Sequence, residues 1–253
     1  MDLQLQGKTA LITGGSKGIG LEIALTLAAE GCNIGLCARN QEEVDAAVAK
    51  VLEKGVKATG SVVDITNDKS LQDWVATCAE KLGGVDTFIV NASAGGADVE
   101  ESGWRRNFET DVLAVWRGVN AVLPYLEKST SGSIVMLSST AALEKFAGAV
   151  PYGAMKAAML NYAGNLAHDL AAKGIRVNTV SPGPVYIEDG AWGQIKQGMP
   201  EVYESVLAAI PLGRMGSAAE VANQVAFLAS PLAGYTTGAN VVMDGCYTQR
   251  INY

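Results

Sequence analysis

Along the chain, apolar runs rich in strand-forming residues alternate with segments that have the periodicity of helices. The strand-like runs occupy residues 8–14, 33–40, 57–64, 85–96, 132–140, 175–184 and 239–245. Several of the helix-like segments between them end at a glycine, which is a frequent helix stop. This alternation is typical of a parallel sheet covered by helices on both faces. Because no linker interrupts it, the sequence predicts a single α/β domain over residues 1–253.

A glycine-rich turn lies between the first strand-like run and the helix-like segment that follows it. Residues 13–20 read TGGSKGIG, in which the spacing is TGxxxGxG and not GxGxxG. Gly14, Gly18 and Gly20 would let the backbone pass close to a pyrophosphate, and the helix N-terminus would add free N–H groups and the positive end of a dipole. The turn therefore predicts a dinucleotide site beyond the carboxyl ends of the strands, where such sheets bind ligands. The alternative is an ordinary strand–helix turn.

The residues at the end of the second strand-like run bear on the choice of dinucleotide. An Asp or Glu there hydrogen-bonds the 2′-hydroxyl of the adenosine ribose, whereas an Arg accommodates a 2′-phosphate. In this sequence Arg39 follows Ala38 and precedes Asn40, and Lys17 of the glycine-rich turn would add a second cation. These residues favour NADP(H) as the cofactor. The alternative for Arg39 is a solvated residue at a strand end.

Tyr152 and Lys156 are four residues apart in PYGAMK, residues 151–156, a stretch predicted to be helical. That spacing places both side chains on one helical face, one turn apart. A fixed ammonium nearby favours the phenolate, so such a Tyr could exchange a proton with a carbonyl compound or an alcohol near neutral pH. Ser139, at the end of the fifth strand-like run, could hydrogen-bond the same substrate oxygen. The alternatives are an exposed Tyr beside a solvated Lys, and a serine hydroxyl bonded to its own turn.

Five motifs occur together in this sequence: TGGSKGIG at 13–20, NASAG at 91–95, Ser139, the Tyr152–Lys156 pair and SPGP at 181–184. In content, order and approximate separation they resemble the short-chain dehydrogenases/reductases, and the resemblance covers essentially the whole chain. It implies a single Rossmann-like, doubly wound domain with a seven-stranded parallel sheet and helices on both faces. It also implies hydride transfer between a nicotinamide and a carbonyl compound or secondary alcohol, and assembly as a homotetramer.

The resemblance assigns catalytic roles to three of these residues. Tyr152 would be the acid/base, Lys156 would lower the pKa of the Tyr152 phenol and bind the nicotinamide ribose, and Ser139 would polarise the substrate oxygen. Ser138 is the competing serine, and the family's spacing to the tyrosine selects Ser139.

The resemblance also implies which residues bind the cofactor. They are Gly14, Ser16, Lys17, Gly18, Ile19, Gly20, Arg39, Asp64, Ile65, Asn91, Ala92, Tyr152, Lys156, Pro182, Gly183 and Val185. Within this set, Asp64 would meet the adenine and Asn91 would support the central region of the cofactor. Pro182, Gly183 and Val185 would lie near the nicotinamide.

Two positions depart from the family's pattern. Asp111 stands where the family usually has an Asn, 28 residues before the active serine. We expect it to act in catalysis, but a charged Asp111 would stabilise the Lys156 ammonium and weaken its pull on the phenol. Ile187 stands where many members have a Thr that bonds the carboxamide of the cofactor.

Residues 186–210 are mixed in character and look irregular, and we predict that they form a substrate lid over the site. Among its aromatic residues, we expect Trp192 and Tyr186 to contact a substrate. The sequence leaves open the identity of the substrate and the physiological direction of the reaction. A non-catalytic NADP(H)-binding sensor or scaffold is the alternative function, and the Tyr-x-x-x-Lys spacing disfavours enoyl reduction.

Composition excludes several other classes of function. The net charge of −7 and the lack of a basic block argue against nucleic-acid binding. The sequence has no run of 18 apolar residues, so we predict no membrane span, and the first residues do not read as a signal peptide. The four cysteines form neither a CxxC pair nor a metal-ligating pattern, so we expect no metal, free thiols and a cytoplasmic location.

Overall fold

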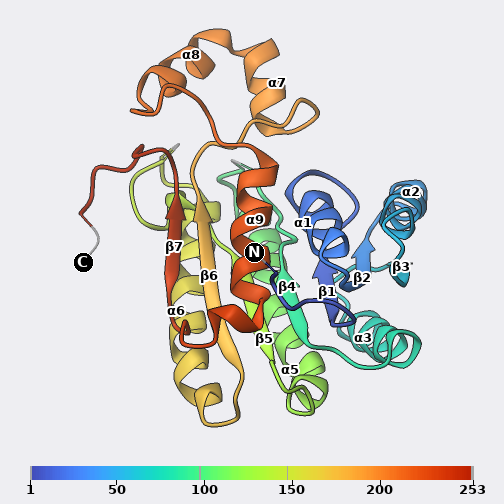
Figure 1. The fold of residues 1–253 in the computed structure, drawn as a ribbon. Helices are drawn as coiled ribbons and strands as arrows, with labels where there is room; N and C mark the ends of the chain where they lie inside the picture. The colour runs from blue at the N-terminus through green and yellow to red at the C-terminus, as the bar shows by residue number, and fades with distance from the viewer. Residues whose placement is uncertain (1, 97, 147, 252–253) are drawn as a thin grey trace.

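The computed structural model describes residues 2–96, 98–146 and 148–251. Among these residues, seven strands form one parallel sheet in the order β3-β2-β1-β4-β5-β6-β7. The strands are β1 (Thr9–Thr13), β2 (Asn33–Ala38), β3 (Ala58–Val62), β4 (Thr87–Val90), β5 (Ser133–Leu137), β6 (Arg176–Pro182) and β7 (Asn240–Met243). Helices cover both faces of the sheet (Figure 1). The predicted Rossmann-like, doubly wound architecture is therefore confirmed.

Several of the longer helices begin where the sequence supplies a cap or a proline. Their bounds are α1 (Gly18–Ala29), α2 (Gln41–Leu52), α3 (Asp68–Leu82), α4 (Glu101–Phe108), η1 (Glu109–Leu113), α5 (Ala114–Leu126), η2 (Thr140–Ala142), α6 (Pro151–Ala171), α7 (Ala191–Gly198), α8 (Pro200–Ala208), α9 (Ala218–Ala229) and η3 (Pro231–Ala233). The side chains of Asn40 and Asn67 cap α2 and α3, and Ser217 forms a capping box at α9. Pro151 stands in the first turn of α6, where its missing N–H is not needed.

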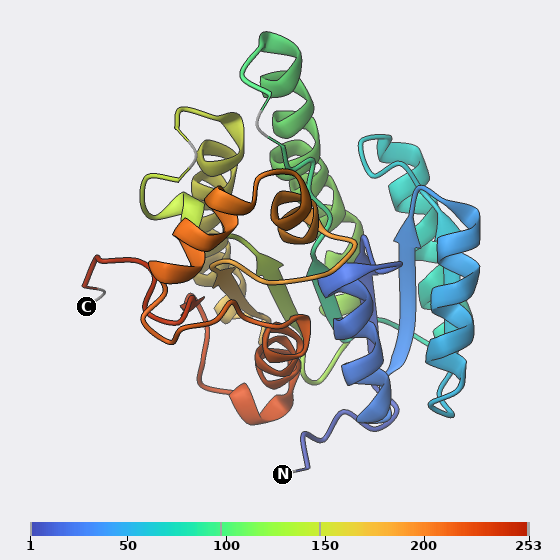
Figure 2. The same cartoon turned by 90° about the horizontal axis from the view of Figure 1, so that it is seen from above.

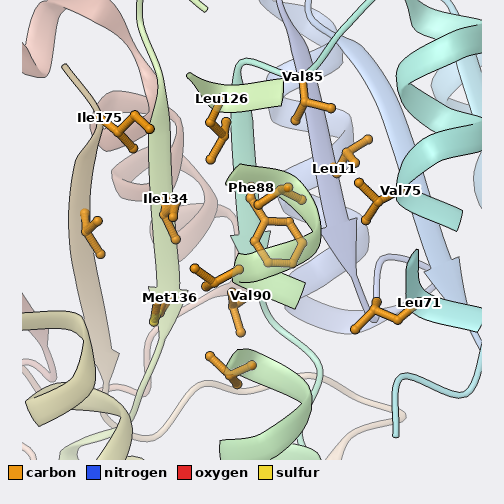
Figure 3. Close-up of a cluster of buried hydrophobic side chains, with 14 of the residues drawn as sticks. Leu11, Leu71, Val75, Val85, Phe88, Val90, Leu126, Ile134, Met136 and Ile175 are labelled. Atoms are coloured by element: carbon orange, nitrogen blue, oxygen red, sulfur yellow. The ribbon is translucent and has the colours of Figure 1, made fainter. Parts of the chain in front are cut away.

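The two faces of the sheet carry separate apolar cores. On one face, α1, α2 and α9 pack against the sheet, and on the other face α3, α5 and α6 do so. Phe88 of β4 lies at the centre of the second core, between Leu11 on β1 and Ile134 on β5, with which it is in register (Figure 3). A Cβ at Gly118 of α5 would come within 2.9 Å of the Phe88 ring, so the absence of a side chain lets this helix sit close.

Because the strands are parallel, their carboxyl ends meet at one edge of the sheet. The loops after β1, β2, β4, β5 and β6 all begin at this edge, and they carry most of the predicted site residues. Residues 186–210 extend beyond the same edge (Figures 1 and 2).

Two local expectations were wrong in detail. Residues 186–210 are not irregular, because α7 and α8 make up most of them, with Gly190 before α7 and Pro200 at the first position of α8. The helical region predicted over 101–127 is interrupted by the π-helical turn η1, which includes Asp111. Such turns often occur at functional sites. Among the described residues, we find no helix with the length and apolar character needed to cross a membrane.

Candidate active site

The backbone of the glycine-rich turn between β1 and α1 disfavours side chains at its glycines, by conformation at Gly14 and Gly18 and by crowding at Gly20. Gly14 and Gly18 have φ of +65° and +58°, a conformation that favours glycine. A Cβ at Gly20 would lie 2.2 Å from the Gly14 carbonyl oxygen. Asn91 Nδ2 donates to the carbonyl oxygens of Thr13 and Gly14, at 3.0 and 2.9 Å. The end of β4 therefore holds the turn in shape.

The shape of the turn fits the pyrophosphate of a dinucleotide. The first N–H groups of α1 have no partner within the helix, and the positive end of the helix dipole lies there. Beside Gly18 the space is open, because the side chain of Ile187 is the sole described group near an added Cβ, at 3.6 Å. Ala92 N donates to Thr13 Oγ1 at 3.2 Å, which places Ala92 beside the turn, and Ile19 packs on the core beneath it. These residues could hold the cofactor that the sequence predicts.

Glu43 of α2, which the sequence did not single out, contacts the charged residues of the turn. Lys17 Nζ lies 2.9 Å from Glu43 Oε1, and Ser16 Oγ donates to Glu43 Oε2 at 3.1 Å. The hydrogen bond from Lys17, together with Ser16 and the nearby Arg39 guanidinium, lowers the pKa of the Glu43 carboxyl. The signal that could have found it is the pattern Asn-x-x-Glu at a predicted strand end, which places Glu43 in the first turn of a helix.

Asp64 and Ile65 follow β3 at the same edge of the sheet. Asp64 Oδ1 accepts hydrogen bonds from Thr66 Oγ1 at 2.7 Å and Thr66 N at 3.0 Å. These bonds, with a contribution from Arg39, lower the pKa of the Asp64 carboxyl. Ile65 packs against the core formed with α3 and α5. Both residues therefore lie at the same carboxyl edge of the sheet as the glycine-rich turn.

Lys156 is buried at the centre of the candidate catalytic group. Its Nζ donates to the Leu137 carbonyl oxygen at 2.9 Å and lies 3.1 Å from Asp111 Oδ1. The same atom is 5.7 Å from the centroid of the Tyr152 ring. Lys156 is therefore fixed between the end of β5, the η1 turn and the Tyr152 ring.

Asp111 is fully buried in the η1 turn. Its Oδ2 accepts a hydrogen bond from Ala94 N at 3.0 Å, which ties η1 to the loop after β4. Its Oδ1 forms an ion pair with Lys156. Among the described residues, this oxygen has no partner with the geometry of a hydrogen bond. Asp111 thus brings a buried carboxylate to the Lys156 ammonium.

The two serines after β5 differ in what their hydroxyls do. Ser138 is buried, and its Oγ donates to the Lys156 carbonyl oxygen at 3.1 Å. Ser139 is half-buried, and its Oγ accepts from Ala141 N at 3.1 Å, so its own proton can still be donated. A Cβ at Gly153 would lie 2.6 Å from the Ala141 carbonyl oxygen. The first turn of α6, which carries Tyr152, therefore packs directly on the turn that follows Ser139.

The loop after β6 completes the site and leads into the segment 186–210. Gly183 N donates to the Met243 carbonyl oxygen at 2.9 Å, which fixes the end of β6 next to β7, and Pro182 is the last residue of β6. Val185 is buried and bridges to Gly216. These residues lie at the same carboxyl edge as the glycine-rich turn, as expected.

Aromatic side chains connect the 186–210 segment to the rest of the site. The Trp192 ring on α7 meets the Phe146 ring edge-on, with the centroids 6.4 Å apart. Phe146 belongs to the loop between Ser139 and Tyr152. Tyr186 packs edge-on against Tyr203, and Lys196 Nζ lies 5.2 and 5.3 Å from those two ring centroids. The segment thus contacts the loop beside the candidate catalytic group.

Comparisons with known proteins agree with this geometry. A family model described as enoyl-(acyl carrier protein) reductase matches residues 14–248. The chain is 39% identical over 246 residues to isoepoxydon dehydrogenase patN of Aspergillus clavatus, covering 95% of each protein. It is 33% identical over 254 residues to 7alpha-hydroxysteroid dehydrogenase of Escherichia coli, covering 99% of this chain and 98% of that protein.

Solved structures extend the likeness to the whole fold. An NADPH-bound short chain oxidoreductase of Pseudomonas aeruginosa superposes with a TM-score of 0.90 at 29% identity, covering 96% of this chain and 98% of that one. An NAD+-bound xylitol dehydrogenase superposes with a TM-score of 0.87 at 30% identity, covering 94% and 98%. The chain belongs to the short-chain dehydrogenase/reductase family of oxidoreductases.

Proposed function

We propose that the protein is an NADP(H)-dependent oxidoreductase that interconverts a carbonyl compound and a secondary alcohol. The observation that supports this best is the buried Lys156, with its Nζ 5.7 Å from the Tyr152 ring centroid. The turn after Ser139 packs on the same helical turn that carries Tyr152. This packing supports roles for Tyr152 as the acid/base and for Ser139 as a hydrogen-bond donor, beside a fixed cation.

In the reducing direction, Tyr152 donates its phenolic proton to the carbonyl oxygen, and Ser139 donates a hydrogen bond to the same oxygen. A bound nicotinamide would supply a hydride to the carbonyl carbon, and would accept one in the oxidising direction. Lys156 holds its ammonium group beside the phenol, through the Leu137 carbonyl oxygen and Asp111. Asp111 acts as a positioning residue, because it touches Lys156 and not the reacting oxygen.

The choice of NADP(H) is supported by the cations at the adenosine end. Arg39 follows β2 and Lys17 precedes α1, so both can reach a 2′-phosphate at this edge. The family does not decide the matter, since its solved structures include one with NADPH and one with NAD+. The proposed contacts to the cofactor are the sixteen positions predicted from the sequence, from Gly14 to Val185.

We propose that residues 186–210 form the substrate lid. Trp192 contacts Phe146 of the loop between Ser139 and Tyr152, which supports a place for the lid above the substrate. Named relatives include dehydrogenases of isoepoxydon and of a 7alpha-hydroxysteroid, which favours a carbonyl or secondary alcohol on a cyclic compound. The description of the matching family model favours an alternative reaction, enoyl reduction. The Tyr-x-x-x-Lys spacing argues against that alternative.

The test is a screen of cyclic ketones, secondary alcohols and one enoyl thioester, read by nicotinamide absorbance with NADP(H) and NAD(H). Turnover of a ketone or alcohol, with NADP(H) preferred, is the expected result. Tyr152→Phe should lose at least about a hundredfold in kcat, as expected for loss of an acid/base, while it still binds NADPH. Full activity in this variant, or turnover of the enoyl thioester alone, would refute the proposed reaction.

We also propose a homotetramer in the cytoplasm. Trp104, Phe108 and Trp116 on α4 and α5 are 39%, 44% and 53% exposed, which is unusual for large apolar side chains and supports an interface at these helices. The four free cysteines, three of them buried, support a reducing compartment. Light scattering should give the mass of four chains, and Trp116→Glu should lower it; a wild-type monomer would exclude the tetramer.

A further inference from the structure

A carboxylate lies among the groups that we assign to the adenosine phosphate. Glu43 accepts hydrogen bonds from Lys17 Nζ at 2.9 Å and from Ser16 Oγ at 3.1 Å. Both donors belong to the set proposed to contact NADP(H). An ammonium and a hydroxyl are also what a phosphate oxygen requires. Glu43 therefore already uses the donors that a 2′-phosphate would need.

The local fold fixes this carboxylate more firmly than it fixes the lysine. Glu43 is the third residue of α2, and its N–H donates to the capping Asn40 Oδ1 at 3.0 Å. The Glu43 side chain is 36% exposed, whereas that of Lys17 is 77% exposed. The position of Glu43 therefore determines where the flexible lysine rests, and a ligand must draw Lys17 away from it.

Cations and carboxylates lie close together at the proposed phosphate position. The pKa of Glu43 is lowered by Lys17, Ser16 and Arg39, so the side chain is an anion at neutral pH. The Arg39 guanidinium also lowers the pKa of Asp64, so it is near both carboxylates. A phosphate monoester carries about −1.5 to −2 charges at neutral pH. It would be repelled by Glu43 while it is attracted by Lys17 and Arg39.

We propose that Glu43 is a specificity-determining residue that weakens the binding of NADP(H) relative to NAD(H), by competing with the 2′-phosphate for Lys17 and Ser16. This inference rests on the proposed function, which takes Lys17 and Arg39 as the phosphate site. NAD(H) carries a hydroxyl at the same position. That hydroxyl meets no repulsion and can donate to a carboxylate.

The experiment is a fluorescence titration of the full-length protein with NADPH and with NADH, without substrate. Glu43→Gln keeps the shape and removes the charge. We expect its Kd for NADPH to fall about fivefold, the effect of about 1 kcal/mol at an exposed charge pair, and its Kd for NADH to change by less than about twofold. Glu42→Gln is the matched control. It removes the same charge from the same first turn of α2, where Glu42 is exposed and contacts neither Lys17 nor Ser16 among the described residues.

A Lys17→Gln background tests the mechanism. If Glu43 acts by competing for Lys17, the gain from Glu43→Gln in NADPH affinity should be smaller there, as a double-mutant cycle would show. Equal changes for both nucleotides, a change no larger than that of Glu42→Gln, or weaker NADPH binding would overturn the inference.

The same titrations distinguish a wrong choice of cofactor from a wrong inference about Glu43. Wild-type protein that binds NADH but not NADPH would overturn the choice of NADP(H), and a gain of NADPH binding in Glu43→Gln would then still support the inference. Wild-type protein that binds neither nucleotide would overturn both.

Discussion

Two lysine–carboxylate pairs lie in the proposed cofactor site, and they differ in burial far more than in distance. Lys156 Nζ and Asp111 Oδ1 are 3.1 Å apart, with side chains 2% and 0% exposed. Lys17 Nζ and Glu43 Oε1 are 2.9 Å apart, with side chains 77% and 36% exposed. Charges attract strongly where water is excluded, but losing one member there leaves the other without solvation. At the surface, water and salt replace a lost partner.

This difference in burial suits the two pairs to different tasks. The buried pair holds the Lys156 ammonium in one geometry, because no solvent can substitute for either member. The exposed pair can open at small cost, so a ligand can take one member from the other. Distance alone would have ranked the two pairs in the wrong order of importance.

The largest expected effect is on folding stability at the buried pair. Asp111→Leu would leave the Lys156 ammonium buried beside the Leu137 carbonyl oxygen, so we expect the free energy of unfolding to fall by about 3–5 kcal/mol. Urea denaturation measures it. The double variant Asp111→Leu/Lys156→Met should recover most of the loss, since no lone charge remains. A single variant within about 1 kcal/mol of wild type would show that the buried pair is no stronger than an exposed one.

The next effect concerns the exposed end. Arg39→Asp reverses a charge beside the proposed phosphate position, and we expect the Kd for NADPH to rise at least about tenfold, because hydrogen bonds to charged groups contribute about 1.5–3 kcal/mol. The Kd for NADH should change much less. Both values come from nucleotide fluorescence titrations. Equal losses for the two nucleotides would mean that Arg39 does not face a 2′-phosphate.

A third prediction removes the charge of the buried carboxylate but keeps its shape. Asp111→Asn should let the Lys156 ammonium act more strongly on the Tyr152 phenol, so the pH–rate profile of alcohol oxidation should move by up to about one unit toward lower pH. Glu109→Gln is the control, since Glu109 lies in the same η1 turn but pairs with Arg117 at 3.2 Å on the outside. A pH–rate profile that does not move, or that moves toward higher pH, would show that the Asp111 charge does not weaken the effect of Lys156 on proton transfer.

The smallest effect is on stability at the exposed pair. The lowered pKa of Glu43 means that its pair with Lys17 stabilises the fold above the unfolded-state value of about 4.5, and that this contribution is lost as the pH falls through the lowered value. Because the pair is exposed, we expect wild type to exceed Glu43→Gln by only a few tenths of a kcal/mol. Urea unfolding from pH 7.5 to 3.5 should show a constant difference down to about pH 5 and a smaller one below. A difference that grows on acidification would contradict this assignment.

The sequence predicted the sheet and most of the positions at its edge. Apolar runs mark the strands, because strands covered on both faces are rich in apolar residues, although β6 also buries Arg176, Asn178 and Ser181. Gly14, Gly18 and Gly20 mark the turn, since the first two have positive φ and the third lies against the Gly14 carbonyl oxygen. The juxtaposition of Tyr152 and Lys156 follows from helical spacing alone.

What the sequence did not predict depends on contacts between elements. Helices α7 and α8 are each too short for periodicity to be decisive, and packing among Tyr186, Trp192 and Tyr203 stabilises them. The Asn-x-x-Glu pattern places Glu43 in the first turn of α2, but its bonds to Lys17 and Ser16 depend on how α2 packs beside the glycine-rich turn. Likewise, η1 arises where the buried Asp111 reaches both Lys156 and the Ala94 N–H, a tertiary requirement that local propensity does not encode.

The amide of Asn91 bonds two consecutive carbonyl oxygens at the end of β1, and this has a kinetic consequence. Contacts within the polypeptide therefore hold the proposed nucleotide-binding turn in its shape. Little conformational entropy is then left to lose on association. We expect nucleotide capture to proceed in one rapid step that is limited by encounter and not by rearrangement.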